Sequence, residues 1–172
     1  KPMQNQPEAS YWFPENMLKW DPEDDEDFIY NVSSIPLAER VEKSKLQVSN
    51  ETQNPEMNVV ALSIMNSSTS GNAPHGINTV DANVYSYWQY IDKMVYWGGS
   101  SGEGIIVAPS ADVIDAAHKN GVPVLGTIFF PQTAHGGKME WLNTFLEKDG
   151  DEFPIVDKLI EVAESYGFDG WF

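Results

Sequence analysis

The strongest constraint on the fold of this chain is the alternation of helical and extended patterns between residues 110 and 172. Ser110 is a suitable N-cap for a helix that runs to Lys119, and Gly121 is placed to end that helix in the left-handed conformation. The apolar run 122–130 that follows is typical of a buried strand, and Pro131 ends it. A helix followed directly by a buried strand is the repeating unit of an α/β fold.

The same order repeats towards the C-terminus. A helix is predicted over about 139–148, and Pro154 begins another at a first position, where its missing N–H costs nothing. Gly167 ends that helix, and residues 168–172 begin a further strand. Strands that alternate with helices through short glycine-ended turns predict right-handed βαβ units, and therefore a parallel sheet.

The preceding part of the chain contributes two more strand candidates. Residues 59–65 form a short run rich in β-branched side chains, which predicts a strand buried on both faces. Residues 66–76 are rich in Ser, Asn and Gly and are expected to form a loop. The segment 88–97 is a second strand candidate, although its first half is equally compatible with the end of a helix.

Composition excludes several classes of function. The formal charge is −16, with 26 acidic against 10 basic side chains, and such a field repels the phosphates of nucleic acids and anionic membranes. No run of about 18 apolar residues is present, so no membrane span is expected. The chain has no cysteine, which fits either an oxidising or a reducing compartment. A neutral ligand such as a sugar is unaffected by the charge.

Four stretches, taken in chain order, carry a resemblance to a known family. They are Tyr11–Pro14 with Leu18–Pro22 and Ile35–Arg40, Tyr87–Asp92 with Val95–Gly98, Ala116–Thr127, and Tyr166–Phe172. The last, Tyr-Gly-Phe-Asp-Gly-Trp-Phe, is similar to the fourth-strand signature of retaining glycosidases that act on N-acetylglucosamine. Together the stretches resemble glycoside hydrolase family 85, the endo-β-N-acetylglucosaminidases, most of all the large D type that Gram-positive bacteria secrete or display.

The resemblance implies a truncated fold. Family members carry a (β/α)8 TIM barrel, which typically needs about 250 residues, whereas this chain has 172. We therefore expect the N-terminal half of such a barrel, with residues 1–57 as a segment that packs on it and 58–172 as its first strands and helices. A start at Lys1 and an apolar strand at the very end agree with a fragment, whose partner would be the remainder of the same barrel.

The resemblance also implies a reaction. Such enzymes hydrolyse the β-1,4 bond of the N,N'-diacetylchitobiose core of N-linked glycans with retention, through attack by the substrate's own acetamido oxygen, and no cofactor is involved. An Asn orients that amide, and a Glu two residues later acts as acid and base. The expected positions are two and four residues beyond Phe172, so this chain holds no catalytic residue. The substrate would be an N-linked glycan or glycoprotein, and the location a bacterial cell surface or the medium.

Strand parity assigns directions to the side chains of the signature. Alternate side chains of a strand face opposite sides, so Phe168, Gly170 and Phe172 are expected to face the barrel interior. Asp169 and Trp171 would then face the surrounding helices. Parity therefore predicts a structural hydrogen bond for Asp169 in place of a catalytic role.

Candidate substrate-binding residues follow the predicted strands, because barrel enzymes do their chemistry where strands end. Trp97 is the best candidate for stacking on a sugar ring, although a core-capping role fits equally well. Phe130 and Gln132 are further candidates, together with His135, for which a role outside binding remains the alternative.

The other titratable side chains are expected to be structural. Asp92 is interpreted as a hydrogen-bonded structural carboxylate, and His118 as a packing residue near a helix C-terminus. The three histidines, His75, His118 and His135, lack the spacing of zinc ligands, so no metal site is predicted.

Three functions remain open at this stage. The first is an endo-β-N-acetylglucosaminidase, the second a non-catalytic glycan-binding barrel, and the third a chitinase-like glycosidase. Residues beyond Phe172 discriminate among them, since Asn-x-Glu supports the first, Asp-x-Glu the third and the lack of Glu the second. The isolated chain is expected to be inactive and prone to aggregation.

Overall fold

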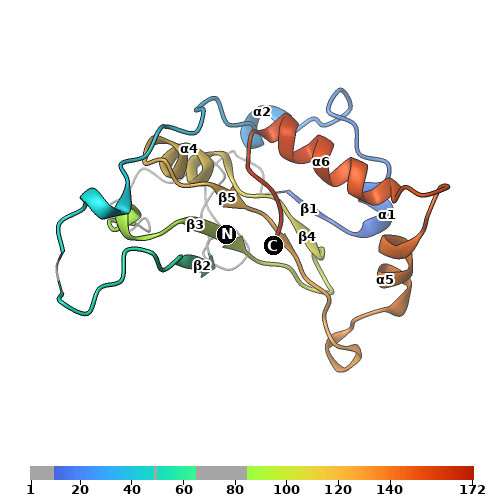
Figure 1. The fold of residues 1–172 in the computed structure, drawn as a ribbon. Coiled ribbons are helices and arrows are strands. Elements are labelled where there is room, and N and C mark those ends of the chain that lie inside the picture. The colour runs from blue at the N-terminus through green and yellow to red at the C-terminus, as the bar shows by residue number, and fades with distance from the viewer. Residues whose placement is uncertain (1–9, 49, 65–84) are drawn as a thin grey trace.

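The structure is a computed structural model that describes residues 10–48, 50–64 and 85–172. The following elements occur in chain order: β1 (Tyr11–Trp12), α1 (Pro14–Met17), α2 (Phe28–Asn31), η1 (Lys43–Lys45), β2 (Val60–Ile64), η2 (Trp88–Tyr90), β3 (Lys93–Trp97), β4 (Ile106–Val107), α4 (Ala111–Lys119), β5 (Val124–Leu125), β6 (Thr127–Ile128), η3 (Thr133–His135), α5 (Met139–Leu146) and α6 (Pro154–Tyr166). Figure 1 shows α4 beside β5, and α6 beside α1 and α2. The molecule is a mixed α/β structure.

The strands form two separate three-stranded sheets. β2, β3 and β5 form a parallel sheet in which Val60 pairs with Lys93 and Met94 pairs with Val124. β1, β4 and β6 form an antiparallel sheet. The parallel sheet expected from the alternation is confirmed for β2, β3 and β5, whereas the antiparallel sheet was not expected. The antiparallel sheet forms because β4 pairs with β6, which follows β5, and β1 pairs with the other side of β4. β1 and β4 are far apart in the sequence, so no local pattern predicts this pairing.

The last residues of the chain extend the parallel sheet. Trp171 forms a parallel bridge with Gly126. The Gly126 amide donates to the Gly170 carbonyl at 2.9 Å, and the Phe172 amide donates to the Gly126 carbonyl at 2.8 Å. Segment 169–172 therefore lies next to β5 and β6, in the position expected of a further strand.

The strand predicted at 59–65 exists as β2, but it is not buried on both faces. Its side chains alternate between exposed and half-buried, and Leu62 is 51% exposed. β2 is the outer strand of the three-stranded sheet, and Val60, Leu62 and Ile64 on one of its faces are exposed. The segment 88–97 divides into the η2 turn and β3, and only β3 is strand.

The predicted ends of the two longest helices are confirmed. Ser110 is the N-cap of α4, and Gly121 follows that helix with φ of 70°. Pro154 is the first residue of α6, and Gly167 ends it in the left-handed conformation with φ of 83°. The Phe168 amide donates to the Ala163 carbonyl at 3.0 Å, which closes the last turn of α6.

The buried side chains form two clusters. The larger cluster joins α6 and the N-terminal segment to β4 and α4, and its members include Met17, Ile106, Ile114, Val162 and Tyr166. The smaller cluster lies between α4 and the parallel strands and includes Met94, Ala117 and Val122. Burial of these side chains from water holds the helices on the sheets.

Candidate active-site groove

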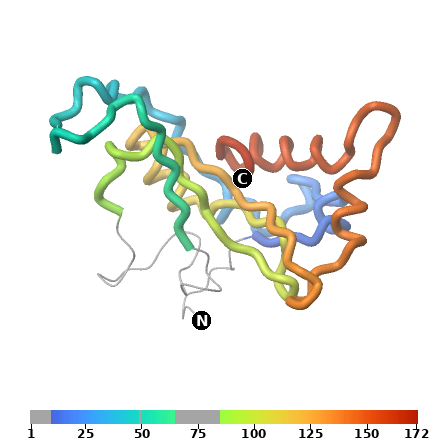
Figure 2. Tube along the Cα trace, turned by 60° about the horizontal axis from the view of Figure 1, so that its bottom comes forward, coloured from blue at the N-terminus to red at the C-terminus, as the bar shows by residue number. Residues whose placement is uncertain are grey.

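A groove lies where β3 and β6 end, the end of the sheet at which barrel enzymes do their chemistry. Its volume is about 460 Å³, and it is lined by Gly99, Ser100, Ser101, Phe129, Phe130, Pro131, Gln132 and His135. The two contributing loops lie side by side in Figure 2, where residues near 100 meet residues near 130. The Ser101 hydroxyl donates to the His135 carbonyl at 2.7 Å and ties the loops together.

The loop after β6 is shaped by glycine and proline. Gly136 ends the η3 turn with φ of 84°, a conformation that side chains with a Cβ rarely adopt. A Cβ at Gly137 would lie 1.8 Å from the Pro131 carbonyl oxygen, so only glycine fits there. The Gln132 carbonyl accepts the amides of His135 and Gly137 at 2.8 and 3.0 Å. These bonds hold the backbone of the loop while its side chains stay exposed.

The structure brings three of the four predicted binding residues together. Phe130, Gln132 and His135 all line the groove, and the Phe130 ring packs edge-on against Phe145 of α5 at 5.1 Å. Trp97 does not line the groove, but its ring lies 6.0 Å from that of Phe129, which does. Whether any of the four binds substrate stays a prediction.

Sequence reasoning missed Phe129 and the turn of Gly99, Ser100 and Ser101 as lining residues. Phe129 and Phe130 lie beyond the end of β6, where strand alternation no longer applies, and both line the groove. The contribution of the glycine-rich turn depends on how two loops pack, which no local pattern records.

The groove can hold an uncharged ligand. Aromatic rings offer apolar faces, and Gln132 and the two serines offer hydrogen-bond donors and acceptors. None of the described residues that line it is Asp or Glu, so the described part of the groove carries no carboxylate for acid–base chemistry. Among described residues, no group of three His, Asp or Glu could hold a metal ion. His75 lies outside the described residues.

The carboxyl group of Asp169 is structural, in agreement with strand parity. Its Oδ2 accepts the Val124 amide at 2.7 Å and faces His118 Nε2 at 2.7 Å. Trp171 also faces the helices, since its indole N–H donates to the Leu159 carbonyl of α6 at 2.9 Å. The direction predicted for Phe168 is wrong, because its ring lies in the cluster beneath α6 and contacts Trp171. Phe168 closes the helix end, so strand alternation begins only after it.

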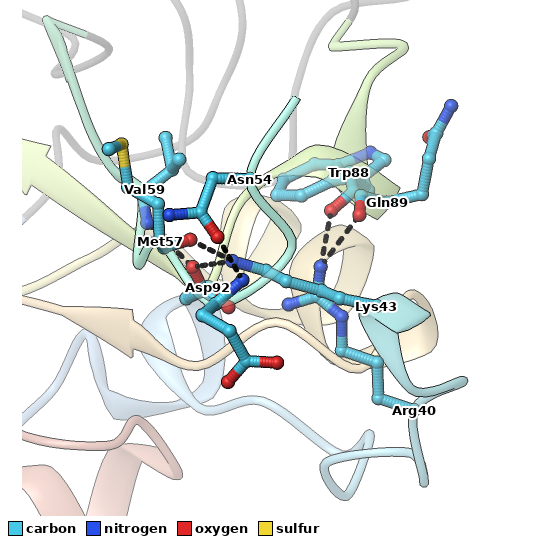
Figure 3. Close-up of polar contacts among 9 residues, drawn as sticks. Arg40, Lys43, Asn54, Met57, Val59, Trp88, Gln89 and Asp92 are labelled. Atoms are coloured by element: carbon cyan, nitrogen blue, oxygen red, sulfur yellow. Dashed lines mark hydrogen bonds and ion pairs between the residues drawn. The ribbon is translucent and has the colours of Figure 1, made fainter. Parts of the chain in front are cut away.

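Asp92 lies at the opposite end of the sheet, at the start of β3. The ammonium group of Lys43 lies 2.5 Å from its Oδ2, and the Val59 amide donates to the same oxygen at 2.6 Å (Figure 3). Burial by itself would raise the pKa of Asp92, but the hydrogen bonds from Lys43 and Val59 and the charges of Lys43 and Arg40 lower it below its ordinary value. The prediction of a structural carboxylate is supported.

A second cavity of about 340 Å³ adjoins this ion pair. Its lining includes Lys43, Leu46, Met57 and Tyr90. Its lining residues belong to the segments that precede β2 and β3, at the amino ends of these strands. Figure 2 shows the teal loop before β2 far from the loops that form the groove. Residues at that end of barrel strands serve stability, so the candidate site is assigned to the groove.

The sequence model of glycosyl hydrolase family 85 matches residues 65–172. The glycoside hydrolase domain of Endo-D from Streptococcus pneumoniae R6 superposes with a TM-score of 0.80 and 38% identity, over 97% of this chain and 25% of that chain. Among the described residues, no helix is long and apolar enough to cross a membrane.

Curated relatives come from vertebrates. The cytosolic endo-beta-N-acetylglucosaminidase of Gallus gallus is 31% identical over 91% of this chain, and the chain spans 20% of that relative's length. The mouse enzyme of the same name is 38% identical over 52% of this chain and 12% of its own length. The zebrafish enzyme is 27% identical over 91% of this chain.

These names contradict the expected location. A secreted or cell-surface bacterial protein was expected, with a link to the cell wall, whereas the curated relatives are named as cytosolic vertebrate enzymes. The expectation had no physical basis in the residues, because a cysteine-free acidic chain is compatible with either side of a membrane.

The sequence match and the structural match agree with the order of motifs along the chain. The match to the family model covers more than half of the sequence, and it includes β3, the groove loops and the terminal signature. A shared fold alone would not decide function, but identity of 38% over nearly the whole chain goes beyond the fold. The chain belongs to glycosyl hydrolase family 85.

Proposed function

We propose that the protein carrying this chain is an endo-β-N-acetylglucosaminidase that cleaves the β-1,4 bond of the N,N'-diacetylchitobiose core of N-linked glycans. Family membership and the names of the curated relatives support this substrate class. Catalysis is substrate-assisted and retains the anomeric configuration, with an Asn and a Glu two and four residues beyond Phe172. The chain is the N-terminal half of a (β/α)8 barrel, completed by the rest of the polypeptide.

The observation that carries the proposal is where the terminal strand leads. The Phe172 carbonyl accepts the Ile128 amide at 2.9 Å, and Ile128 directly precedes the groove residue Phe129. Segment 169–172 runs parallel to β5, so the chain beyond Phe172 continues towards the end of the sheet that holds the groove. Side chains two residues apart on that strand share a face, so the Asn and the Glu would enter the groove together.

Within this groove, Phe130 offers an aromatic face to a sugar ring, and Gln132 and His135 offer hydrogen bonds to its hydroxyls. The ring of Trp97 packs against that of Phe129, which lines the groove. The missing acid–base group is the Glu beyond Phe172, which would protonate the leaving oxygen and then deprotonate water. In this proposal the residues of this chain bind the sugar and the residues after Phe172 supply the acid–base group, which is consistent with a described groove lining that lacks carboxylates.

The test is release of glycans by the full-length protein. A high-mannose glycoprotein incubated with it should lose its glycans and keep one N-acetylglucosamine on each Asn, as mass spectrometry of both products detects. Substitution of the Glu four residues beyond Phe172 by Gln should abolish release. Cleavage next to the Asn side chain, or cleavage of chitin in place of N-glycans, contradicts the proposal. The isolated 172-residue chain should bind weakly and release nothing.

A further inference from the structure

His118 and Asp169 form a hydrogen-bonded pair that joins three separate segments. His118, in the last turn of α4, is only 3% exposed. Its Nδ1 lies 2.6 Å from the Ile35 carbonyl oxygen, and its Nε2 lies 2.7 Å from Asp169 Oδ2. The Ile35 carbonyl oxygen only accepts, so Nδ1 of His118 donates to it, and Nε2 is left to pair with the Asp169 carboxyl group. The side chain of Asp169 is 25% exposed.

Asp169 binds both backbone groups of Val124. Its amide donates to the Val124 carbonyl at 2.9 Å, and its carboxylate accepts the Val124 amide at 2.7 Å. The carboxylate oxygen thus occupies the position of a backbone carbonyl at the start of the ladder, which is the row of backbone hydrogen bonds between segment 169–172 and residues 124–128. The bonds of Gly126, Phe172 and Ile128 follow in order from this point.

Two side chains of segment 169–172 hold it in place: Trp171 bonds to the Leu159 carbonyl of α6, and Asp169 bonds to β5 itself. Gly126 and Gly170 bond to each other, and neither has a side chain that could interlock with a neighbour. Gly170 also has φ of 144°, outside the strand region. Glycine-rich strands specify their register weakly, and a slip of one residue turns each following side chain to the opposite face. The contact between Asp169 and Val124 therefore specifies the pairing with β5, while Trp171 holds the segment against α6.

We propose that Asp169, oriented by His118, is a positioning residue for the glycosidase reaction. It fixes the register of segment 169–172 against β5 and β6, and thereby places the reacting side chains that follow Phe172. His118 holds the carboxyl group turned towards Val124, and it anchors the pair to the N-terminal segment through Ile35. This inference rests on the proposed function, because the residues positioned are those expected beyond Phe172.

The experiment compares variants of the full-length protein. Asp169→Ala removes the acceptor, and kcat should fall on the order of 100-fold, the usual effect of displacing a reacting group by about 1 Å. KM should stay within about threefold, because the groove residues that bind substrate are unchanged. Asp169→Asn should recover most of kcat, since its amide oxygen still accepts the Val124 N–H, whereas Asp169→Leu should not.

Asp115→Ala is the matched control. Asp115 lies on the same helix and accepts the Ser33 hydroxyl at 2.6 Å, so it also ties α4 to the N-terminal segment. Its hydrogen-bond partner Ser33 belongs to the N-terminal segment and not to segment 169–172, so the kcat of Asp115→Ala should equal that of the wild type. Equal losses of kcat in Asp115→Ala and Asp169→Ala, in proportion to the folded fraction, would show a merely structural role and overturn the proposal.

Amide hydrogen exchange tests the inference without any measurement of glycan release. In Asp169→Ala the peptide covering 122–130 should exchange faster than in the wild type, while that covering α6 should not change. Unchanged exchange in 122–130 overturns the inference even if the proposed function holds. Faster exchange in a protein that cleaves no glycan means that the function is wrong and the register device is real. If Asp169→Ala does not fold, His118→Gln replaces it, and wild-type kcat there overturns the proposal.

Discussion

The ammonium group of Lys43 lies 2.5 Å from the Asp92 carboxylate and also donates to the Met57 carbonyl at 2.6 Å, which ties the η1 turn to the start of β3. Arg40 adds two hydrogen bonds to the carbonyls of Trp88 and Gln89 (Figure 3). The N-terminal segment is thus fastened to the amino end of the parallel sheet, opposite the groove.

This ion pair predicts a dependence of stability on pH. The pKa of Asp92 is lowered from 3.8, so the pair stabilises the folded state fully above that value and loses its effect as pH falls through the lower folded-state pKa. Lys43→Met should therefore lower the melting temperature at pH 6, and the difference from wild type should shrink below pH 3.8. Lys45→Met is the control, because Lys45 pairs at 3.3 Å with an equally exposed Glu42. A difference that grows on acidification would contradict the assignment.

There is no space for a side chain at Gly126, where segment 169–172 pairs with the strand. A Cβ there would lie 2.7 Å from both the Val107 carbonyl oxygen and the Trp171 ring. Gly126→Ala should therefore destabilise the full-length protein by about 1–3 kcal/mol, the usual cost of overpacking. Gly102→Ala, where nothing lies within 4 Å, should leave denaturant unfolding unchanged. Equal stability of the two variants would show that the strand shifts freely.

Tyr166 links α6 to the acidic run of the N-terminal segment. Burial raises the pKa of Tyr166, so the hydroxyl stays protonated and donates to Asp25 Oδ2 at 2.5 Å. Tyr166→Phe should cost about 1.5–3 kcal/mol of unfolding free energy, as expected for a hydrogen bond to a charged group. Tyr87→Phe, at a residue that is mostly exposed, should cost nothing measurable. Thermal unfolding of both variants decides whether the acidic run is fastened by this bond.

Substitution of Gln132 is expected to change substrate binding and not the rate of the chemical step. Its backbone carbonyl holds the loop, and this bond survives in Gln132→Ala. Loss of the side-chain amide should raise KM for an N-glycoprotein about tenfold, the equivalent of one hydrogen bond, with kcat unchanged. Gln89→Ala at the other end of the sheet is the control. An unchanged KM in Gln132→Ala would remove this side chain from the binding site.

Local signals account for the predictions that succeeded. Gly121, Pro154 and Gly167 mark helix ends because backbone conformation at those positions depends on the residue itself. Parity placed Asp169 and Trp171 correctly, since alternation is a property of one strand. Strand alternation gave the wrong direction for Phe168 because this residue closes the last turn of α6 and is not part of the strand.

The sequence by itself determined the family, the helix boundaries and the candidate aromatic and polar residues of the groove, because each depends on short motifs read in order. Only the tertiary structure decided that β1, β4 and β6 pair as an antiparallel sheet, that β2 is an exposed edge, and that the loops after β3 and β6 share one groove. It also brought His118 to Asp169, 51 residues apart. These outcomes depend on contacts between distant segments, and their free energy is gained only when the whole chain packs.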